Sequence, residues 1–148
     1  MMPEVSFDYI TGIKKFSSPR ELRLYLRALL ESYQMSRDNI DSVTGDMIRG
    51  GGEESAQSKG WFKVGSLFAN KSDPNRAGLD ILFQIIKEAK PKIQAVEASL
   101  KTLDKMEETM IPVDATLLLY LRDGVPERIV IGGEAKEEKP EDAASQPA

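Results

Sequence analysis

Two long stretches of this 148-residue chain repeat apolar positions at alternating steps of four and three residues. This heptad spacing places one apolar stripe along the side of a helix. The stripe of the first stretch is interrupted by one polar residue, Ser36, and consists of Leu22, Leu26, Leu29, Tyr33, Ile40, Val43 and Met47. The pattern predicts a helix over 18–49.

Both ends of this first helix carry sequence signals. Ser18 is a capping residue, Pro19 suits the first helical position, and Glu21 occupies the capping-box position. At the other end Arg49 precedes three glycines, and a cation followed by glycine favours a helix C-terminus.

The second stripe predicts another helix, over 73–110. Its apolar positions are Leu79, Leu82, Ile86, Ala89, Ile93, Val96, Leu100 and Leu103. Asp73 and Pro74 repeat the starting signal of the first helix. Pro91 removes a backbone hydrogen bond and clashes with the preceding turn, so we expect a kink or a break near residue 90. Two helices of similar length with matching stripes predict a long antiparallel helical hairpin.

The pattern changes to that of strands near both ends of the chain. Residues 4–10 alternate so that Val5, Phe7 and Tyr9 share a face, which predicts a strand. Residues 115–132 contain two apolar runs on either side of Asp123-Gly124, which predicts a β-hairpin. Since a lone hairpin is marginal in water, we expect the first strand to join it in a small antiparallel sheet. The fold class expected is α+β.

The connection between the helices, 50–72, is longer than the usual limit of about 12–15 residues for a segment without structure or function. Trp61, Val64 and Phe68 stand at helical spacing, so we predict a short amphipathic helix within it. It contains the only tryptophan of the chain, and the stretch from Lys59 to Lys71 has three lysines and no acid.

Three interpretations of this aromatic, basic segment stay open. It folds back over the second helix as part of the core, it binds a protein partner, or it inserts into an anionic membrane surface. Tryptophan and phenylalanine within a basic rim are typical of binding hot spots. If the segment binds a partner, we expect the contacts to come from Trp61, Phe62, Lys63, Leu67 and Phe68.

The chain contains no histidine and no cysteine. This composition excludes Ser-His-Asp and Cys-His catalysis, and it excludes Cys/His metal centres. The glycines that follow Arg49 lack the Gly-Lys-Ser/Thr ending of a phosphate-binding loop. Asp38, Asp41 and Asp46 lack the spacing of a calcium loop and fit a solvated helix face better. We therefore expect no catalytic residue, no metal site and no cofactor.

The formal net charge of −4 arises mainly in the last residues. The segment 134–148 has five acids, two lysines and no large apolar residue, so we predict a disordered acidic tail after a single domain over 1–133. The nearly neutral remainder does not favour nucleic acid as a partner. The amino terminus has no signal-peptide pattern and no apolar run could span a membrane, so we expect a cytoplasmic protein.

These features together predict a non-catalytic protein–protein interaction module, such as an adaptor, a scaffold or an assembly subunit. We also expect a homo-oligomer, because a narrow helical stripe and a strand that is apolar on both faces need cover. The expected oligomer seam is Ile93, Val96, Leu100, Leu103, Leu117 and Leu119. The alternative function is a peripheral membrane protein anchored by 59–71, and a small-ligand sensor or a carboxylate-dependent enzyme is less favoured.

Overall fold

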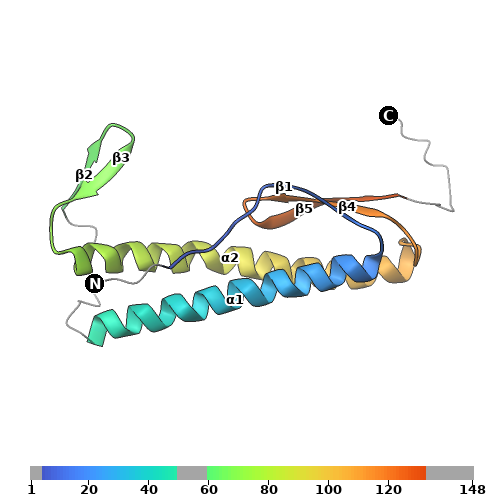
Figure 1. Cartoon of the computed structure of the whole chain (residues 1–148), viewed down its shortest axis with the longest axis horizontal. Coiled ribbons are helices and arrows are strands. Elements are labelled where there is room, and N and C mark those ends of the chain that lie inside the picture. Colours follow the sequence, from blue (N-terminus) through green and yellow to red (C-terminus); the bar gives the residue numbers. More distant parts are fainter. Residues whose placement is uncertain (1–4, 50–59, 133–148) are drawn as a thin grey trace. The chain divides into compact units, whose positions relative to one another are not determined.

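The computed structural model describes residues 5–49 and 60–132 (Figure 1). Its elements in chain order are β1 (Gly12–Phe16), α1 (Pro19–Arg49), β2 (Trp61–Val64), β3 (Leu67–Asn70), α2 (Pro74–Thr109), β4 (Leu117–Arg122) and β5 (Val125–Ile131). Two long helices with two small antiparallel sheets confirm the predicted α+β class. The predicted tail 134–148 and the first part of the connection, 50–59, lie outside the described residues.

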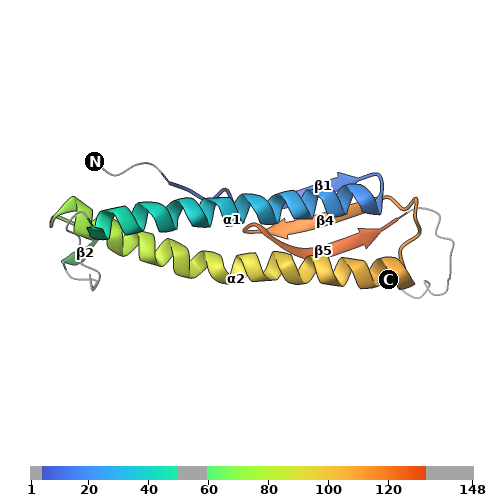
Figure 2. The same cartoon turned by 90° about the horizontal axis from the view of Figure 1, so that it is seen from below.

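The chain divides into two compact units, and each takes one part of both helices. Unit 1 comprises Met1–Phe7 and Tyr33–Pro91, and unit 2 comprises Asp8–Ser32 and Lys92–Ala148. Within each unit the two helix segments run side by side in opposite directions, as the helical hairpin requires (Figure 2). The single domain over 1–133 stays a prediction.

The helices begin where the capping signals place them. The backbone N–H of Glu21 donates to Ser18 Oγ at 3.2 Å, and the Glu21 carboxylate accepts from the Ser17 N–H at 2.9 Å. This second hydrogen bond lowers the pKa of Glu21 because it favours the ionised carboxylate. At the start of α2, the Asp73 carboxylate accepts from the Asn75 N–H at 3.2 Å. The predicted bounds of both helices agree with the structure to within one residue at each end.

Pro91 lies inside α2 without interrupting it, so a break near residue 90 is wrong, whereas the kink near residue 90 stays a prediction. The proline itself is exposed, whereas Ala89 before it and Ile93 after it are both buried. The apolar stripe of α2 is therefore buried both before and after Pro91, the residue that lacks a backbone N–H donor. Packing of such a stripe contributes more to the stability of a helix in a protein than one backbone hydrogen bond does.

A three-stranded antiparallel sheet in unit 2 has β4 at its centre, in the order β1-β4-β5. The predicted hairpin is confirmed, and its turn residues Asp123 and Gly124 have φ angles of 51° and 81°. Positive φ at both positions is typical of the type I′ turn that favours Asp-Gly. One face of the sheet packs on the helix segments of this unit, in a core of Phe16, Leu22, Leu26, Leu103, Ile111, Ala115, Leu117, Leu119 and Leu121.

The third strand does come from the N-terminal part of the chain, but not from 4–10. β1 pairs with β4 in a register that sets Phe16 opposite Leu117 and so buries the Phe16 ring in the core. Tyr9, expected in the strand, lies before it and has Lys92 Nζ 4.6 Å from its ring centroid. The local alternation over 4–10 was therefore a weaker constraint than the cross-strand partners that β4 offers.

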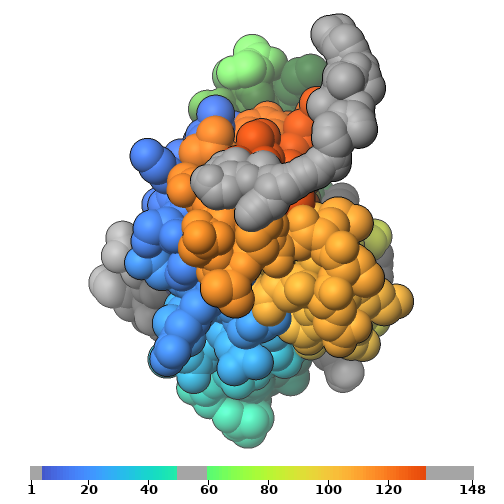
Figure 3. All heavy atoms as spheres, turned by 90° about the vertical axis from the view of Figure 1, so that its right-hand side faces the viewer, coloured from blue at the N-terminus to red at the C-terminus, as the bar shows by residue number. Residues whose placement is uncertain are grey.

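The segment that follows α2 completes the core at one end of unit 2. Ile111 and Ala115 on this segment belong to the same cluster as Leu22 at the start of α1. Figure 3 shows this end, where the orange segment lies between the blue start of α1 and the yellow end of α2. The helix segments and the sheet of this unit thus share one core.

Candidate functional site

The aromatic segment between the helices is a β-hairpin, and the predicted short helix is wrong. β2 pairs with β3 so that Trp61 is opposite Asn70 and Val64 is opposite Leu67. Gly65 and Ser66 form the two-residue connection, and Gly65 has a φ of 61°, as the first position of a type II′ turn requires. A Gly-Ser pair between two runs of β-forming residues is a signal that could have identified the hairpin.

The register divides the side chains of this hairpin between two faces, since neighbours along a strand point to opposite sides. The first, which we name the anchor face, contains Trp61, Lys63, Phe68 and Asn70. The second, which we name the apolar hairpin face, contains Phe62, Val64, Leu67 and Ala69. Every side chain on the apolar hairpin face is a hydrocarbon group, and Phe62, Val64 and Leu67 are 43%, 56% and 71% exposed.

The anchor face contacts α2 within unit 1. Trp61 Nε1–H donates a hydrogen bond to Asp80 Oδ2 at 2.7 Å, and both side chains are partly buried. An open cleft of about 410 Å³ is lined on one side by Trp61 and Phe68 and on the other by α2 residues 80, 81 and 84. Lys63 Nζ lies 5.8 Å from the ring centroid of Phe68, its cross-strand partner. The tryptophan thus attaches the hairpin to the helix.

The five predicted partner-binding residues all lie on the β2–β3 hairpin, but they differ in how exposed they are. Trp61 is half-buried against α2, whereas Phe62, Lys63, Leu67 and Phe68 are exposed. Sequence reasoning missed Asp80, and nothing in the sequence distinguishes this carboxylate from others on the helix. The binding of a partner by these residues stays a prediction.

The predicted oligomer seam lies inside the chain. Five of its side chains are buried, namely Ile93, Val96, Leu103, Leu117 and Leu119. Leu100, the sixth, is half-buried and packs against the core of unit 2. The cover that we expected from a second copy is supplied by the chain itself, so these residues no longer support a homo-oligomer.

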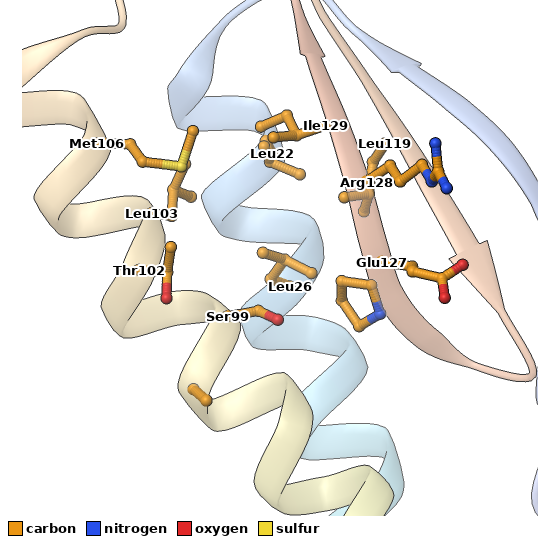
Figure 4. A pocket seen from close by; sticks show the side chains of 12 residues that line it. Leu22, Leu26, Ser99, Thr102, Leu103, Met106, Leu119, Glu127, Arg128 and Ile129 are labelled. Atoms are coloured by element: carbon orange, nitrogen blue, oxygen red, sulfur yellow. The ribbon is translucent and has the colours of Figure 1, made fainter.

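A cavity of about 210 Å³ lies in unit 2 between α1, α2 and β5 (Figure 4). Apolar side chains such as Leu26, Leu103 and Met106 form most of its wall. The Ser99 hydroxyl donates to the backbone oxygen of Ala95 at 2.9 Å, and Glu127 extends from β5 on the side away from α2. The cavity is smaller than the usual range of about 300–1,000 Å³ for ligand sites, and it lacks convergent polar groups.

The acidic residues of the described part of the chain do not form a metal site. No group of three or more carboxylates in residues 5–49 and 60–132 is arranged to hold an ion. Asp46 pairs with Arg49, and Asp38 lies 3.8 Å from Arg37, so two members of the predicted solvated face have basic neighbours. Neither helix in these residues is long and apolar enough to cross a membrane.

Arg23 forms a structural ion cluster that the sequence did not indicate. Its guanidinium on α1 donates to Asp104 and to Glu107 on α2, each at 2.6 Å. The hydrogen bonds to Glu107 and Asp104 raise the pKa of Arg23 above its ordinary value, because they favour the charged guanidinium. The cluster joins the two helix segments of unit 2.

Comparison of the chain with protein-family models, with curated proteins and with solved structures gives no match. The function therefore has to be argued from the residues of this chain alone. Among the sites described above, the β2–β3 hairpin combines exposed apolar side chains with a defined attachment to the rest of its unit.

Proposed function

We propose that the protein is a non-catalytic protein–protein interaction module that binds its partner through the apolar hairpin face. One observation carries the proposal: Phe62, Val64 and Leu67 share a single exposed face, while the opposite face attaches the hairpin to α2. Exposed apolar groups gathered in one place mark interaction sites on protein surfaces.

The energetics fit a complex of weak to moderate affinity. Full burial of a valine, leucine or phenylalanine side chain contributes about 1.5–3 kcal/mol each. Part of this gain offsets the lost translational and rotational freedom of the two proteins. The hairpin backbone is already ordered by its own pairing and by the Trp61–Asp80 hydrogen bond, so less ordering entropy opposes binding. In this proposal the module acts in the cytoplasm as an adaptor, a scaffold or an assembly subunit.

A membrane surface is the second candidate partner, and one observation favours it. Val64 and Leu67 flank the turn, Lys63 and Lys71 lie close in sequence, and residues 60–72 contain no carboxylate. An apolar turn with basic neighbours is suited to the interface of an anionic bilayer. Two lysines provide only weak electrostatic attraction, so we place the protein partner first.

The test compares a hairpin variant with a matched surface variant. Intact chain, the double variant Phe62→Ser with Leu67→Ser, and the control Met35→Ser are used to capture proteins from the native source. Met35 is an exposed apolar residue on α1, outside the hairpin. We expect one or more specific proteins to be retained by the intact chain and by Met35→Ser, and to be lost from the double variant.

Two measurements keep this test interpretable. Urea unfolding shows whether the double variant folds, and flotation with phosphatidylcholine/phosphatidylserine vesicles tests the membrane alternative. Capture that is unchanged in a folded double variant would contradict the proposal. Flotation of the intact chain that the double variant loses, without any specific captured protein, would replace the protein partner by the membrane surface.

A further inference from the structure

The sheet of unit 2 has a second face, which the helices do not cover. The strand register assigns eight side chains to this outer sheet face: Ile13, Lys15, Leu118, Tyr120, Arg122, Val125, Arg128 and Val130. The alternate residues of the same strands, including Phe16, Leu117 and Ile129, point to the core. In Figure 1 the helix segments of this unit lie on one side of the sheet, and none of its described elements lies on the other.

The outer sheet face is more apolar than a solvated sheet face usually is. Antiparallel sheets with one open face normally alternate apolar residues inward with polar residues outward. Here Ile13 on β1 is 69% exposed and Val130 on β5 is 56% exposed, and Leu118 and Tyr120 between them are half-buried. An apolar band therefore crosses all three strands.

The band runs diagonally and has a basic residue on each side. One cross-strand row reads Ile13, Tyr120, Arg128, and the next reads Lys15, Leu118, Val130. The apolar ends of the two rows are Ile13 and Val130, so the basic ends Arg128 and Lys15 occupy the other two corners. The pattern is an apolar stripe with positive charge on both flanks.

The register assigns three basic side chains and no acidic one to this face, and Glu127 brings one carboxylate to Arg122. The three basic residues are Lys15, Arg122 and Arg128, of which Arg122 pairs with Glu127 at 3.2 Å. Within residues 5–49 and 60–132, no carboxylate forms a salt bridge with Lys15 or Arg128. A partner with carboxylates on both sides of an apolar stripe would meet complementary charge at both corners.

We propose that the outer sheet face docks an acidic amphipathic helix of a second protein. Its apolar stripe would lie along the diagonal from Ile13 to Val130, and its flanking carboxylates would reach Lys15 and Arg128. This is the arrangement by which helices already cover the inner face of the same sheet. The inference concerns a different unit from the β2–β3 hairpin and does not depend on the function proposed above.

Other occupants fit this surface less well. A second copy of the chain would bring a basic face against a basic face. The acidic segment 134–148 has no large apolar residue with which to cover Ile13 or Val130. A membrane would contact only the projecting side chains, because Leu118 and Tyr120 are half-buried within the sheet.

Two synthetic helical peptides with the same leucine stripe test the proposal, one with glutamates and one with lysines on its flanks. Each is titrated into the full-length, isotope-labelled chain, and backbone amide shifts are followed by NMR. We expect the acidic peptide to shift amides of β1, β4 and β5 and to bind at least 10-fold more tightly than the basic one. The double variant Lys15→Glu with Arg128→Glu should reverse this preference.

A charge-matched control makes the result specific to this face. Arg20→Glu with Arg27→Glu changes two exposed basic residues of α1 and alters the net charge by the same amount. We expect it to leave the preference for the acidic peptide in place. Ile13→Ser with Val130→Ser should weaken binding of the acidic peptide by at least 10-fold, while urea unfolding confirms that each variant folds.

Several outcomes would overturn the inference. Equal affinity for both peptides, shifts that lie outside the three strands, or reversal by the α1 control would each exclude a charge-guided site on this face. If the acidic peptide bound only to a chain that ends at Gly132, the residues after Gly132 would be the occupant of this face. Binding to phosphatidylserine vesicles that Lys15→Glu with Arg128→Glu abolishes, without peptide binding, would assign the face to a membrane.

Discussion

The β4–β5 and β2–β3 hairpins have two-residue turns of the same general kind but differ in what covers their side chains. Both turns include a glycine with positive φ, Gly124 at 81° and Gly65 at 61°. The inward side chains of β4, such as Leu117, are buried in the core of unit 2. On β2–β3 even the most apolar face is open to solvent.

The contrast separates the formation of a hairpin from its burial. Turn geometry and β-forming residues are enough to define the pairing of both hairpins. Burial depends on what each face meets, and β4 meets β1, β5 and the helix segments of its unit. The β2–β3 hairpin has a tryptophan hydrogen-bonded to α2, which leaves its other face available for binding.

The largest expected effect is the difference in stability loss between two matched leucine truncations, one in each hairpin. Leu117→Ala leaves a cavity in the core of unit 2 and should lower the free energy of unfolding by about 2–5 kcal/mol. Leu67→Ala removes an exposed side chain and should change it by no more than about 0.5 kcal/mol. Urea unfolding followed by circular dichroism measures both, and equal losses would remove the distinction between the hairpins.

The anchor of β2–β3 is tested by Trp61→Phe, which keeps an aromatic ring but removes the indole N–H. A hydrogen bond to a charged group contributes about 1.5–3 kcal/mol, so amide protection in β2 and β3 should fall by that amount. Protection in β4 and β5 should not change. Asp80→Asn, which retains an acceptor oxygen, should have a smaller effect on hydrogen exchange. Unchanged protection of β2–β3 in Trp61→Phe would show that the anchor lies elsewhere.

The two turn glycines allow the same substitution in each hairpin. An L-residue at positive φ costs roughly 1–2 kcal/mol, and a Cβ on Gly65 would meet no atom within 4 Å, so only this backbone strain applies there. We expect Gly124→Ala to lower global stability and Gly65→Ala to increase hydrogen exchange only in β2–β3. A global loss from Gly65→Ala would indicate that the exposed hairpin supports the fold.

The smallest expected effect is a loss of stability at high pH that comes from Tyr25, which packs against the core of unit 2. Burial raises the pKa of Tyr25 above its ordinary value of about 10, and its hydroxyl has no hydrogen-bond partner among the described residues. A raised pKa in the folded state means that the contribution of Tyr25 to stability is complete below pH 10. It is lost as the pH rises through the folded-state pKa.

Tyr25→Phe should therefore resemble the intact chain at pH 7 and lose less stability above pH 10. Urea midpoints of both chains at pH 7 and pH 11 make the comparison. Titrating groups that the two chains share cancel in the difference. Parallel losses of stability at high pH would show that the Tyr25 hydroxyl is hydrated in the folded protein.

Local sequence signals predicted the elements whose determinants are themselves local. Ser18 and Asp73 determine where the helices begin, and Asp123-Gly124 determines the turn of β4–β5. The position of β1 could not be read in this way, because it depends on partners in β4 that are distant in sequence. The helical stripes likewise show which side chains need cover but not whether the cover comes from the same chain.

The candidate site was predictable as a group of residues but not as a geometry. The aromatic segment stands out by composition, yet Trp61, Val64 and Phe68 have a spacing that fits a helix as well as a hairpin. Only the pairing of β2 with β3 separates the anchor face from the apolar hairpin face. Asp80 becomes part of the site through the hydrogen bond that it accepts from Trp61 and through its place in the wall of the cleft.

The pairing of β1 with β4 has a consequence for the synthesis of the chain on the ribosome. The partner of β1 is encoded about 100 residues later, so at translation rates of about 5–20 residues per second β1 waits roughly 5–20 s for it. The hairpins β2–β3 and β4–β5 pair strands that are close in sequence and can form within about 1–10 μs of their emergence. During this interval Phe16 and the first turns of α1 lack the core partners that β4 supplies, so we expect the nascent N-terminal segment to expose apolar side chains until β4 emerges.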